Sequence, residues 1–177
     1  MVGFLVGLAG TATAGALITF SEFPVGTVVS TQYAPQDVVF WVGTEGTYPI
    51  IANDGAMPTS PVLSPNPPYA GDFWMQFPTP VSYVSFISGY WDTLGSGIIN
   101  VWSPTTFIES LTDTSYGVDT FTISGVGPIE WVYFNSANDP AGADIDNLKV
   151  GVPEPATMLL LGLGLLGLAG FRKKFRA

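Results

Sequence analysis

The chain contains neither cysteine nor histidine. Without cysteine it has no disulfide, no thiolate nucleophile and no iron–sulfur site. Without histidine it lacks the usual zinc ligand and the usual general base at neutral pH, so a Ser-His-Asp triad is excluded. Oxygen-ligated cations such as Ca²⁺ remain compatible with the composition, because aspartate, asparagine and backbone carbonyls supply their ligands.

Charge is also scarce, at 11% of 177 residues, and the basic side chains are unevenly placed. Four of the five lie in the last six positions: Arg172, Lys173, Lys174 and Arg176. Residues 16–151 hold thirteen of the fourteen acidic residues and one basic residue, Lys149, so this body carries a net charge of −12. Nucleic-acid binding depends on cations that neutralise phosphates, so we expect no nucleic-acid partner.

Short β-rich runs alternate with turn residues throughout the body. The runs are LITF, DVVFWVG, DFWMQF, VSYVSFISGY, SGIINVWS, DTFTIS, IEWVYFNS and ADIDNLKV. In the third run, Phe73, Met75 and Phe77 share one strand face. These runs, without an amphipathic helix among them, predict an all-β fold for residues 17–151: an antiparallel β-sandwich, jelly-roll-like in its connectivity.

Turn residues predict two hairpins. Gly95-Ser96-Gly97 separates Tyr90-Trp91 from the run Ile98–Trp102, and the turn GVGP at residues 125–128 separates DTFTIS from IEWVYFNS. The apolar period of the last run breaks between Ile145 and Leu148, which indicates a β-bulge.

One segment, residues 53–71, holds five prolines. Proline cannot donate to a ladder, so this segment is not expected to be a central strand. A loop of this length is either a binding loop or a flexible excursion.

The first sixteen residues, MVGFLVGLAGTATAGA, resemble a secretory signal peptide. Val2–Ala9 is a short apolar region, and small residues follow at the positions that precede a cleavage site. The segment departs from the pattern because no lysine or arginine precedes the apolar region. We predict a signal peptide over residues 1–16; the alternative is a buried first strand.

The last 26 residues combine Pro153-Glu154-Pro155, an uncharged run and a basic cluster. The run Ala156–Phe171 has 16 residues and would span roughly 24 Å as a helix. This is somewhat short, because a membrane helix usually needs ~20 residues. Arg172 and Lys173 can snorkel to extend it, and the four cations fit the cytoplasmic side of a membrane. This predicts a single transmembrane helix over residues 156–171, with the body outside.

The same arrangement resembles the PEP-CTERM sorting signal of Gram-negative bacteria, with VPEPATMLLLGLGLLGLAGFRKKF fitting the pattern throughout. The resemblance implies recognition by an exosortase, a membrane-embedded transpeptidase-like enzyme that removes the tail. It also implies a transient stay in the inner membrane, then delivery to the cell surface or extracellular matrix. Such proteins typically accompany exopolysaccharide and biofilm formation.

The body is similar to secreted jelly-roll domains of PEP-CTERM proteins in Ile18–Phe40, in SYVSFISGYWDTLGSGIINVWS and in DPAGADIDNLKV. Related sandwiches include carbohydrate-binding modules, and many hold a structural Ca²⁺ between the first and last strands. That resemblance implies a site pairing Glu22 with Asp144 or Asp146, and with Asn147. From the residues alone, Asp144 and Asp146 point to one strand face, where carboxylates need a metal or solvent. A solvated turn is the alternative.

Most of the strand tryptophans and tyrosines are expected in the core. Tyr69, in the proline segment, and Trp91, near the glycine turn, are expected to be exposed and are the candidate sugar contacts. Glycoside hydrolysis needs two suitably spaced carboxylates, and nothing in the sequence pairs the glutamates, so no catalytic residue is predicted.

These observations favour an exported, non-enzymatic structural or adhesive protein of the extracellular matrix. The first alternative is a carbohydrate-binding module, which exposed aromatics on one concave face would favour. A distant alternative is a glycoside hydrolase, which two facing carboxylates in a cleft would favour. The partners expected on these readings are an exosortase, the inner membrane before processing, and extracellular polysaccharide.

Overall fold

The computed structural model describes residues 15–151, which form one compact unit. Within this range the chain forms nine strands and one short 3-10 helix, η1 (Ala34–Gln36). The strands are β1 (Ala16–Ile18), β2 (Val39–Val42), β3 (Ile50–Ala52), β4 (Val62–Ser64), β5 (Asp72–Trp91), β6 (Ile98–Trp102), β7 (Phe107–Thr112), β8 (Gly117–Asn135) and β9 (Asp144–Gly151). The prediction of an all-β antiparallel fold is confirmed.

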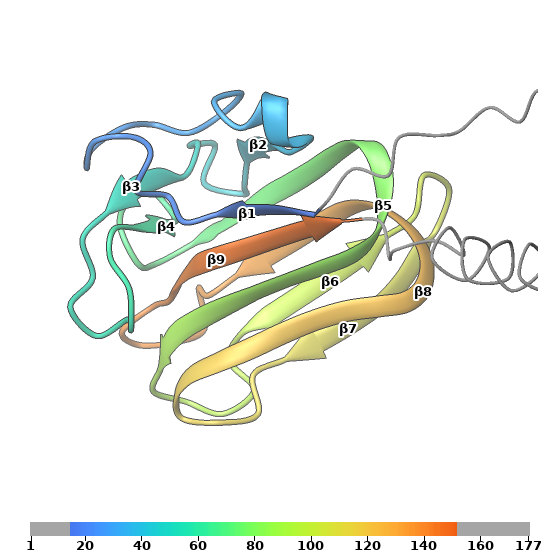
Figure 1. The fold of residues 1–177 in the computed structure, drawn as a ribbon. Coiled ribbons are helices and arrows are strands. Elements are labelled where there is room, and N and C mark those ends of the chain that lie inside the picture. Colours follow the sequence, from blue (N-terminus) through green and yellow to red (C-terminus); the bar gives the residue numbers. More distant parts are fainter. Residues whose placement is uncertain (1–14, 152–177) are drawn as a thin grey trace, which may run out of the picture. The chain divides into compact units, whose positions relative to one another are not determined.

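Two long strands, β5 and β8, organise the whole body (Figure 1). They pair antiparallel almost end to end, with register shifts between Gln76 and Tyr83. Pro78 and Pro80 lie at this point of β5, where they cannot donate to a ladder. Gly125 and Gly127 lie at the matching point of β8 with φ of 73° and 100°. Both strands therefore bend here, and the sheet folds over on itself.

The bend divides the sheet into two layers. The first layer runs β2, the start of β5, the end of β8, β6 and β7. The second layer runs β3, β4, β9, the end of β5 and the start of β8, with β1 also beside β9. The aromatic rings of Phe86, from the second layer, and Phe134, from the first, are 6.5 Å apart. The body is therefore a β-sandwich, while its jelly-roll connectivity stays a prediction.

The core lies between the layers and follows the strand period of two. Phe73, Met75 and Phe77 are fully buried on one face of β5, as predicted, and so are Val84 and Phe86 after the bend. Each Å² of apolar surface that is buried stabilises the folded state by roughly 25 cal/mol, so this core supplies the main stabilising contribution.

The two predicted hairpins are wrong. The turn at residues 125–128 is a bend inside β8, because both of its flanks pair with β5 rather than with each other. The end of β5 likewise does not pair with β6, which lies between β7 and β8. In each case a long-range partner displaces the neighbour in sequence.

The predicted bulge in the last strand is confirmed. Ser85 pairs with Lys149 and Ile87 with Asp146, so β9 has one residue more than β5 over this stretch. Asn147 lies in it with φ of 52°.

The proline segment contains a strand, contrary to expectation. β4 occupies the three residues between Pro61 and Pro65, which include no proline, and it pairs with β3 and, through Leu63, with β9. Outside β4 the segment packs on the outer side of the second layer, where Met57 joins Val62 of β4 in a small buried cluster against which Ile87 and Val118 pack.

The predicted ends lie largely outside the described residues. This applies to positions 1–14 of the predicted signal peptide, to Pro153-Glu154-Pro155, to the predicted membrane helix at 156–171 and to the basic cluster. Among residues 15–151, no helix is long and apolar enough to cross a membrane.

Candidate functional site

The outer side of the first layer carries a group of tryptophans. Phe40, Phe73, Val101 and the pair Val132 and Phe134 point into the core. Strand alternation therefore sends their neighbours outward. These outward residues are Trp41, Trp74, Trp102 and Trp131, together with Tyr133, and we call them the tryptophan face.

The register of the strands brings these rings together. Trp41 lies opposite Trp74, which lies opposite Tyr133 on the next strand. Trp102 lies opposite Trp131. The ring centroid of Trp74 is 5.0 Å from that of Trp102 and 4.7 Å from that of Tyr133. Four of the five tryptophans in the chain thus meet on one face, which the core does not use.

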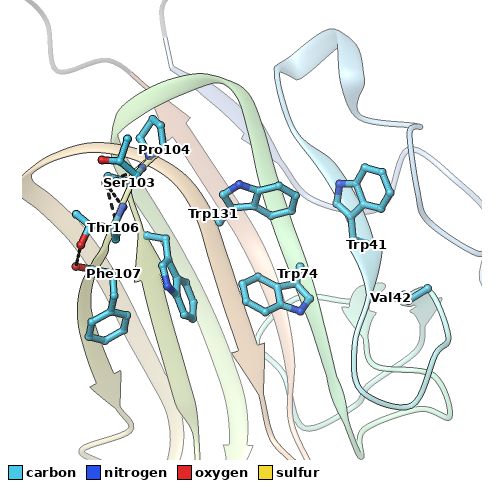
Figure 2. A pocket seen from close by; sticks show the side chains of 10 residues that line it. Trp41, Val42, Trp74, Ser103, Pro104, Thr106, Phe107 and Trp131 are labelled. Carbon is cyan, nitrogen blue, oxygen red and sulfur yellow. Dashed lines mark hydrogen bonds between the residues drawn. The ribbon is translucent and has the colours of Figure 1, made fainter.

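The four tryptophans of this face line a groove of about 880 Å³ (Figure 2). One wall is the β6–β7 turn, residues 103–106, and beside it Phe107, which is 49% exposed. The amide of Ser103 donates to the carbonyl of Thr106 at 2.9 Å, and the Ser103 hydroxyl accepts from the amide of Thr106 at 3.1 Å. The wall is therefore held in place by its own hydrogen bonds.

Two polar side chains that contact the tryptophans are held by hydrogen bonds, and neither is among the residues that line the groove. The indole N–H of Trp41 donates to the Gln76 side-chain oxygen at 2.9 Å, which orients that amide. The Tyr133 hydroxyl donates to Asp72, which also accepts from the amide of Thr44 at 2.9 Å. Burial, followed by the bond to Asp72, raises the pKa of the Tyr133 hydroxyl, so this group is neutral.

The two predicted sugar contacts lie elsewhere. Trp91 is fully buried in the core, where its ring contacts Phe121 and Phe134, so the expectation that it is exposed is wrong. Tyr69 is half-buried, and its hydroxyl donates to the carbonyl of Asn53. Its role as a sugar contact stays a prediction.

The expectation that most tryptophans are in the core is also wrong. It gave weight to the affinity of tryptophan for strands and interiors. The signal that places them outside is alternation: Phe73, Met75 and Phe77 inside require Trp74 outside.

The predicted calcium ligands do not converge as one group. Glu22 accepts from the Tyr33 hydroxyl at 3.1 Å and from Thr19. Although burial opposes it, these hydrogen bonds lower the pKa of Glu22. Asp146 accepts from the Thr59 hydroxyl and from the amide of Asn147 at 2.6 Å. Within residues 15–151, no group of three or more acidic side chains is placed to hold a metal ion.

Asp144 differs from the rest of that set. It is fully buried, and neither carboxylate oxygen has a hydrogen-bond partner. Burial raises its pKa to about 9, and repulsion from Asp54 and Asp146 contributes. Burial likewise raises the pKa of Asp146. Ile145 points into the core, so Asp144 and Asp146 share the opposite face of the strand, as predicted. The proline segment covers them there instead of solvent.

Asp139, at the start of the same acidic stretch, organises loops. Its carboxylate accepts from the amides of Asp92 and Thr93 and from the hydroxyl of Ser96, at 2.9 to 3.1 Å. It thereby joins the β5–β6 loop to the β8–β9 loop, and its role is structural.

Comparison with known proteins identifies one end of the chain. Residues 151–174 match the PEP-CTERM protein-sorting motif, so the chain carries this motif. The resemblance noted in the sequence is confirmed. No curated protein matches the chain.

Among solved structures, the β-rich body is similar to three variants of CBM29-2, a family 29 carbohydrate-binding module. The first is 14% identical, covers 78% of this chain and 92% of its own, and has a TM-score of 0.38. The second is 13% identical over 77% of this chain and 84% of its own, with a TM-score of 0.36. The third is 16% identical over 78% and 91%, also with a TM-score of 0.36.

Proposed function

We propose that this is an exported, non-enzymatic protein whose body binds extracellular polysaccharide through the tryptophan face. One observation carries the proposal: four tryptophans from adjacent strands meet on the outer side of the first layer and line a groove. Between an inert matrix component and a carbohydrate-binding module, this face favours the module. Such a domain would also give the protein its adhesive role in a biofilm or exopolysaccharide matrix.

The chemistry of the groove suits sugars. A pyranose ring has apolar C–H faces and a polar rim, so it can stack on an indole while its hydroxyls stay hydrated. Large exposed aromatic clusters are unusual on a monomer and mark binding surfaces. Tryptophan supplies a wide, rigid contact at low entropic cost.

Hydrolysis is the weaker candidate. The described residues that line the groove are tryptophan, phenylalanine, valine, proline, serine and threonine, without a carboxylate among them. A glycoside hydrolase needs an acid and a second carboxylate on either side of the bond it cleaves. The groove therefore supports binding rather than cleavage.

The sorting motif supports export. On this proposal residues 1–16 direct secretion, residues 17–151 form the binding domain and residues 152–177 are the sorting signal, with a membrane helix over 156–171. An exosortase would act on the tail at the inner membrane, and the body would then reach the cell surface or matrix. The partners proposed are thus an exosortase and extracellular polysaccharide.

A structural Ca²⁺ is a second proposal, favoured by the two unpartnered oxygens of Asp144. A buried carboxylate of this kind is costly unless it is protonated or paired with a cation. Asp54 is the acidic neighbour whose charge acts most strongly on Asp144, so it is the residue that would share the ion. One of its oxygens also accepts from the amide of Ala56 at 2.7 Å.

Polysaccharide binding can be tested by native electrophoresis of the full chain, in mild detergent, through gels that contain soluble polysaccharides. Retention of the wild type is expected, and Trp74→Ala should weaken it at least about tenfold, which corresponds to 1.4 kcal/mol. Tyr116→Ala is the matched control, because Tyr116 is 68% exposed and is not among the residues that line the groove. Equal retention of Trp74→Ala and the wild type would contradict the proposal.

A further inference from the structure

We propose that the ligand of the tryptophan face is a single, uncharged polysaccharide chain rather than an anionic polymer or the surface of a crystalline one. This inference rests on the proposed function and narrows it. It is carried by the charge of the groove, the tilt of its rings and the wall at one side.

Charge disfavours an anionic polymer. Among residues 16–151 the single basic side chain is Lys149, which lies on β9 in the second layer. The body carries a net charge of −12. The described residues that line the groove include no charged side chain. A polymer of uronate or sulfated units would meet repulsion from the body and no cation in the groove to offset it.

The rings do not share a plane. The planes of Trp74 and Trp102 are tilted by 43°, those of Trp41 and Trp131 by 47°, and those of Trp74 and Trp131 by 86°. Figure 2 shows the labelled indoles turned relative to one another. A flat crystal face can lie against one such ring at a time. A separate chain, whose successive sugar units can rotate about their linkages, can present a ring face to each indole in turn.

The β6–β7 turn adds a steric reason. Residues 103–106 form a wall of the groove, and Thr105 on this turn is exposed. Because the turn is fixed by the hydrogen bonds of Ser103, it cannot easily flatten. A wide surface would meet the wall before it reached the indoles, whereas a single strand can lie beside it.

Binding would then depend mainly on stacking. Two side-chain amides beside the face are oriented: Gln76 accepts from Trp41, and Asn135 donates to the Tyr133 hydroxyl at 3.2 Å. Few hydrogen bonds are therefore available to select a particular hydroxyl pattern. We therefore expect the groove to accept several neutral polysaccharides whose pyranose faces are apolar, with modest differences between them.

The test uses the full chain and three kinds of polymer. The soluble neutral polymers are hydroxyethylcellulose, glucomannan and dextran, and the anionic ones are carboxymethylcellulose and carboxymethyldextran. Microcrystalline cellulose and crystalline chitin supply flat surfaces. We expect retention by at least one soluble neutral polymer, at least about tenfold weaker retention by its carboxymethyl form, and no Trp74-dependent adsorption to the crystals.

A charge variant sharpens the result. Thr105→Lys places a cation on the wall of the groove, and Thr120→Lys places the same charge on an exposed position of β8 in the second layer. Thr105→Lys should raise the ratio of retention by the carboxymethyl polymers to retention by their neutral forms several-fold more than Thr120→Lys does.

The outcomes separate the two proposals. Retention by carboxymethyl and neutral forms alike, or adsorption to crystals that Trp74→Ala abolishes, would overturn the single neutral chain and leave polysaccharide binding standing. If none of these polymers is bound, polysaccharide binding itself is overturned, and this inference with it.

Discussion

The two outer faces of the sandwich differ in what lies over them. The first layer leaves its indoles partly uncovered: Trp41 is 44% exposed, and Trp74, Trp102 and Trp131 are half-buried. The second layer is covered by the proline segment, whose Met57 belongs to the cluster against which Ile87 packs and whose Thr59 donates to Asp146. A face that serves only stability is covered by the chain itself, whereas the bare aromatic face is free for a ligand. The contrast predicts that substitutions on the two faces affect different properties.

The largest effect is expected at the one tryptophan inside the core. Trp91→Ala should lower the free energy of unfolding by about 3–5 kcal/mol, because it empties a space bordered by Phe121 and Phe134. Trp74→Ala should lower it less, by about 1 kcal/mol for the lost ring contacts, and should weaken glycan retention at least about tenfold instead. Chemical denaturation of both variants measures the difference, with Trp91→Phe as the conservative control. Equal destabilisation would remove the distinction between core and face.

The cover of the second layer should give the next largest effect. Met57→Ala should cost about 2 kcal/mol of unfolding free energy, since Met57 is 5% exposed in the small cluster under the proline segment. Retention by polysaccharide should stay at the wild-type level, because this cluster is on the other layer. A loss of retention at unchanged stability would mean that the proline segment takes part in binding.

The burial of Asp144 under the proline segment can be tested by measuring how stability depends on pH. Its pKa of about 9 in the folded protein is above its ordinary value, so between these values the folded state holds a proton that the unfolded state has lost. In the presence of EDTA, the contribution of this group to stability should therefore fall as pH rises from about 4 to 9. Asp144→Asn should raise Tm by about 3 °C at pH 8 and leave it unchanged at pH 4.

Bound Ca²⁺ would reverse the expected effect of Asp144→Asn on Tm. If Asp144 holds Ca²⁺, the ion stabilises the folded state by mass action, and Asp144→Asn should lower Tm in millimolar Ca²⁺. The wild-type Tm should then also fall on chelation. A wild-type melting curve that is the same with Ca²⁺ and with EDTA would contradict the calcium proposal and leave a protonated Asp144 carboxyl as the explanation.

The smallest effect is expected at the edge of the bare face. Trp41 contacts Trp131 at one side only, with centroids 6.4 Å apart, whereas Trp74 touches three other rings. Trp41→Ala should therefore weaken retention about threefold, less than the tenfold expected for Trp74→Ala. Affinity electrophoresis of both variants in one gel compares them directly; the reverse order would shift the centre of the site toward β2.

Much of the fold followed from local patterns in the sequence. The period of two placed Phe73, Met75 and Phe77 in the core, and the broken period near Asn147 located the bulge. The double bend of β5 and β8 could not be read in this way. Its proline and glycine residues are also typical of strand ends, and only the pairing of β5 with β8 distinguishes a bend from a turn.

The candidate site was hidden for a related reason. Alternation makes Trp74 an outward residue, but only the register across four strands shows that Trp41, Trp102 and Trp131 join it. The surroundings of Asp144 and Asp146 depend on contact with a segment more than 80 residues away, such as Thr59 with Asp146. Local sequence carries no signal for either of these long-range contacts.

The bent β5–β8 ribbon has a mechanical consequence. If the body is attached beyond Gly151 and its groove holds a polymer, tension enters through β9 at one end and the first layer at the other. β9 pairs with the end of β5, and the start of β5 carries Trp74, so one strand runs from the attachment to the groove. A pull along β9 loads its ladder in shear, with the hydrogen bonds that cross between the strands sharing the force.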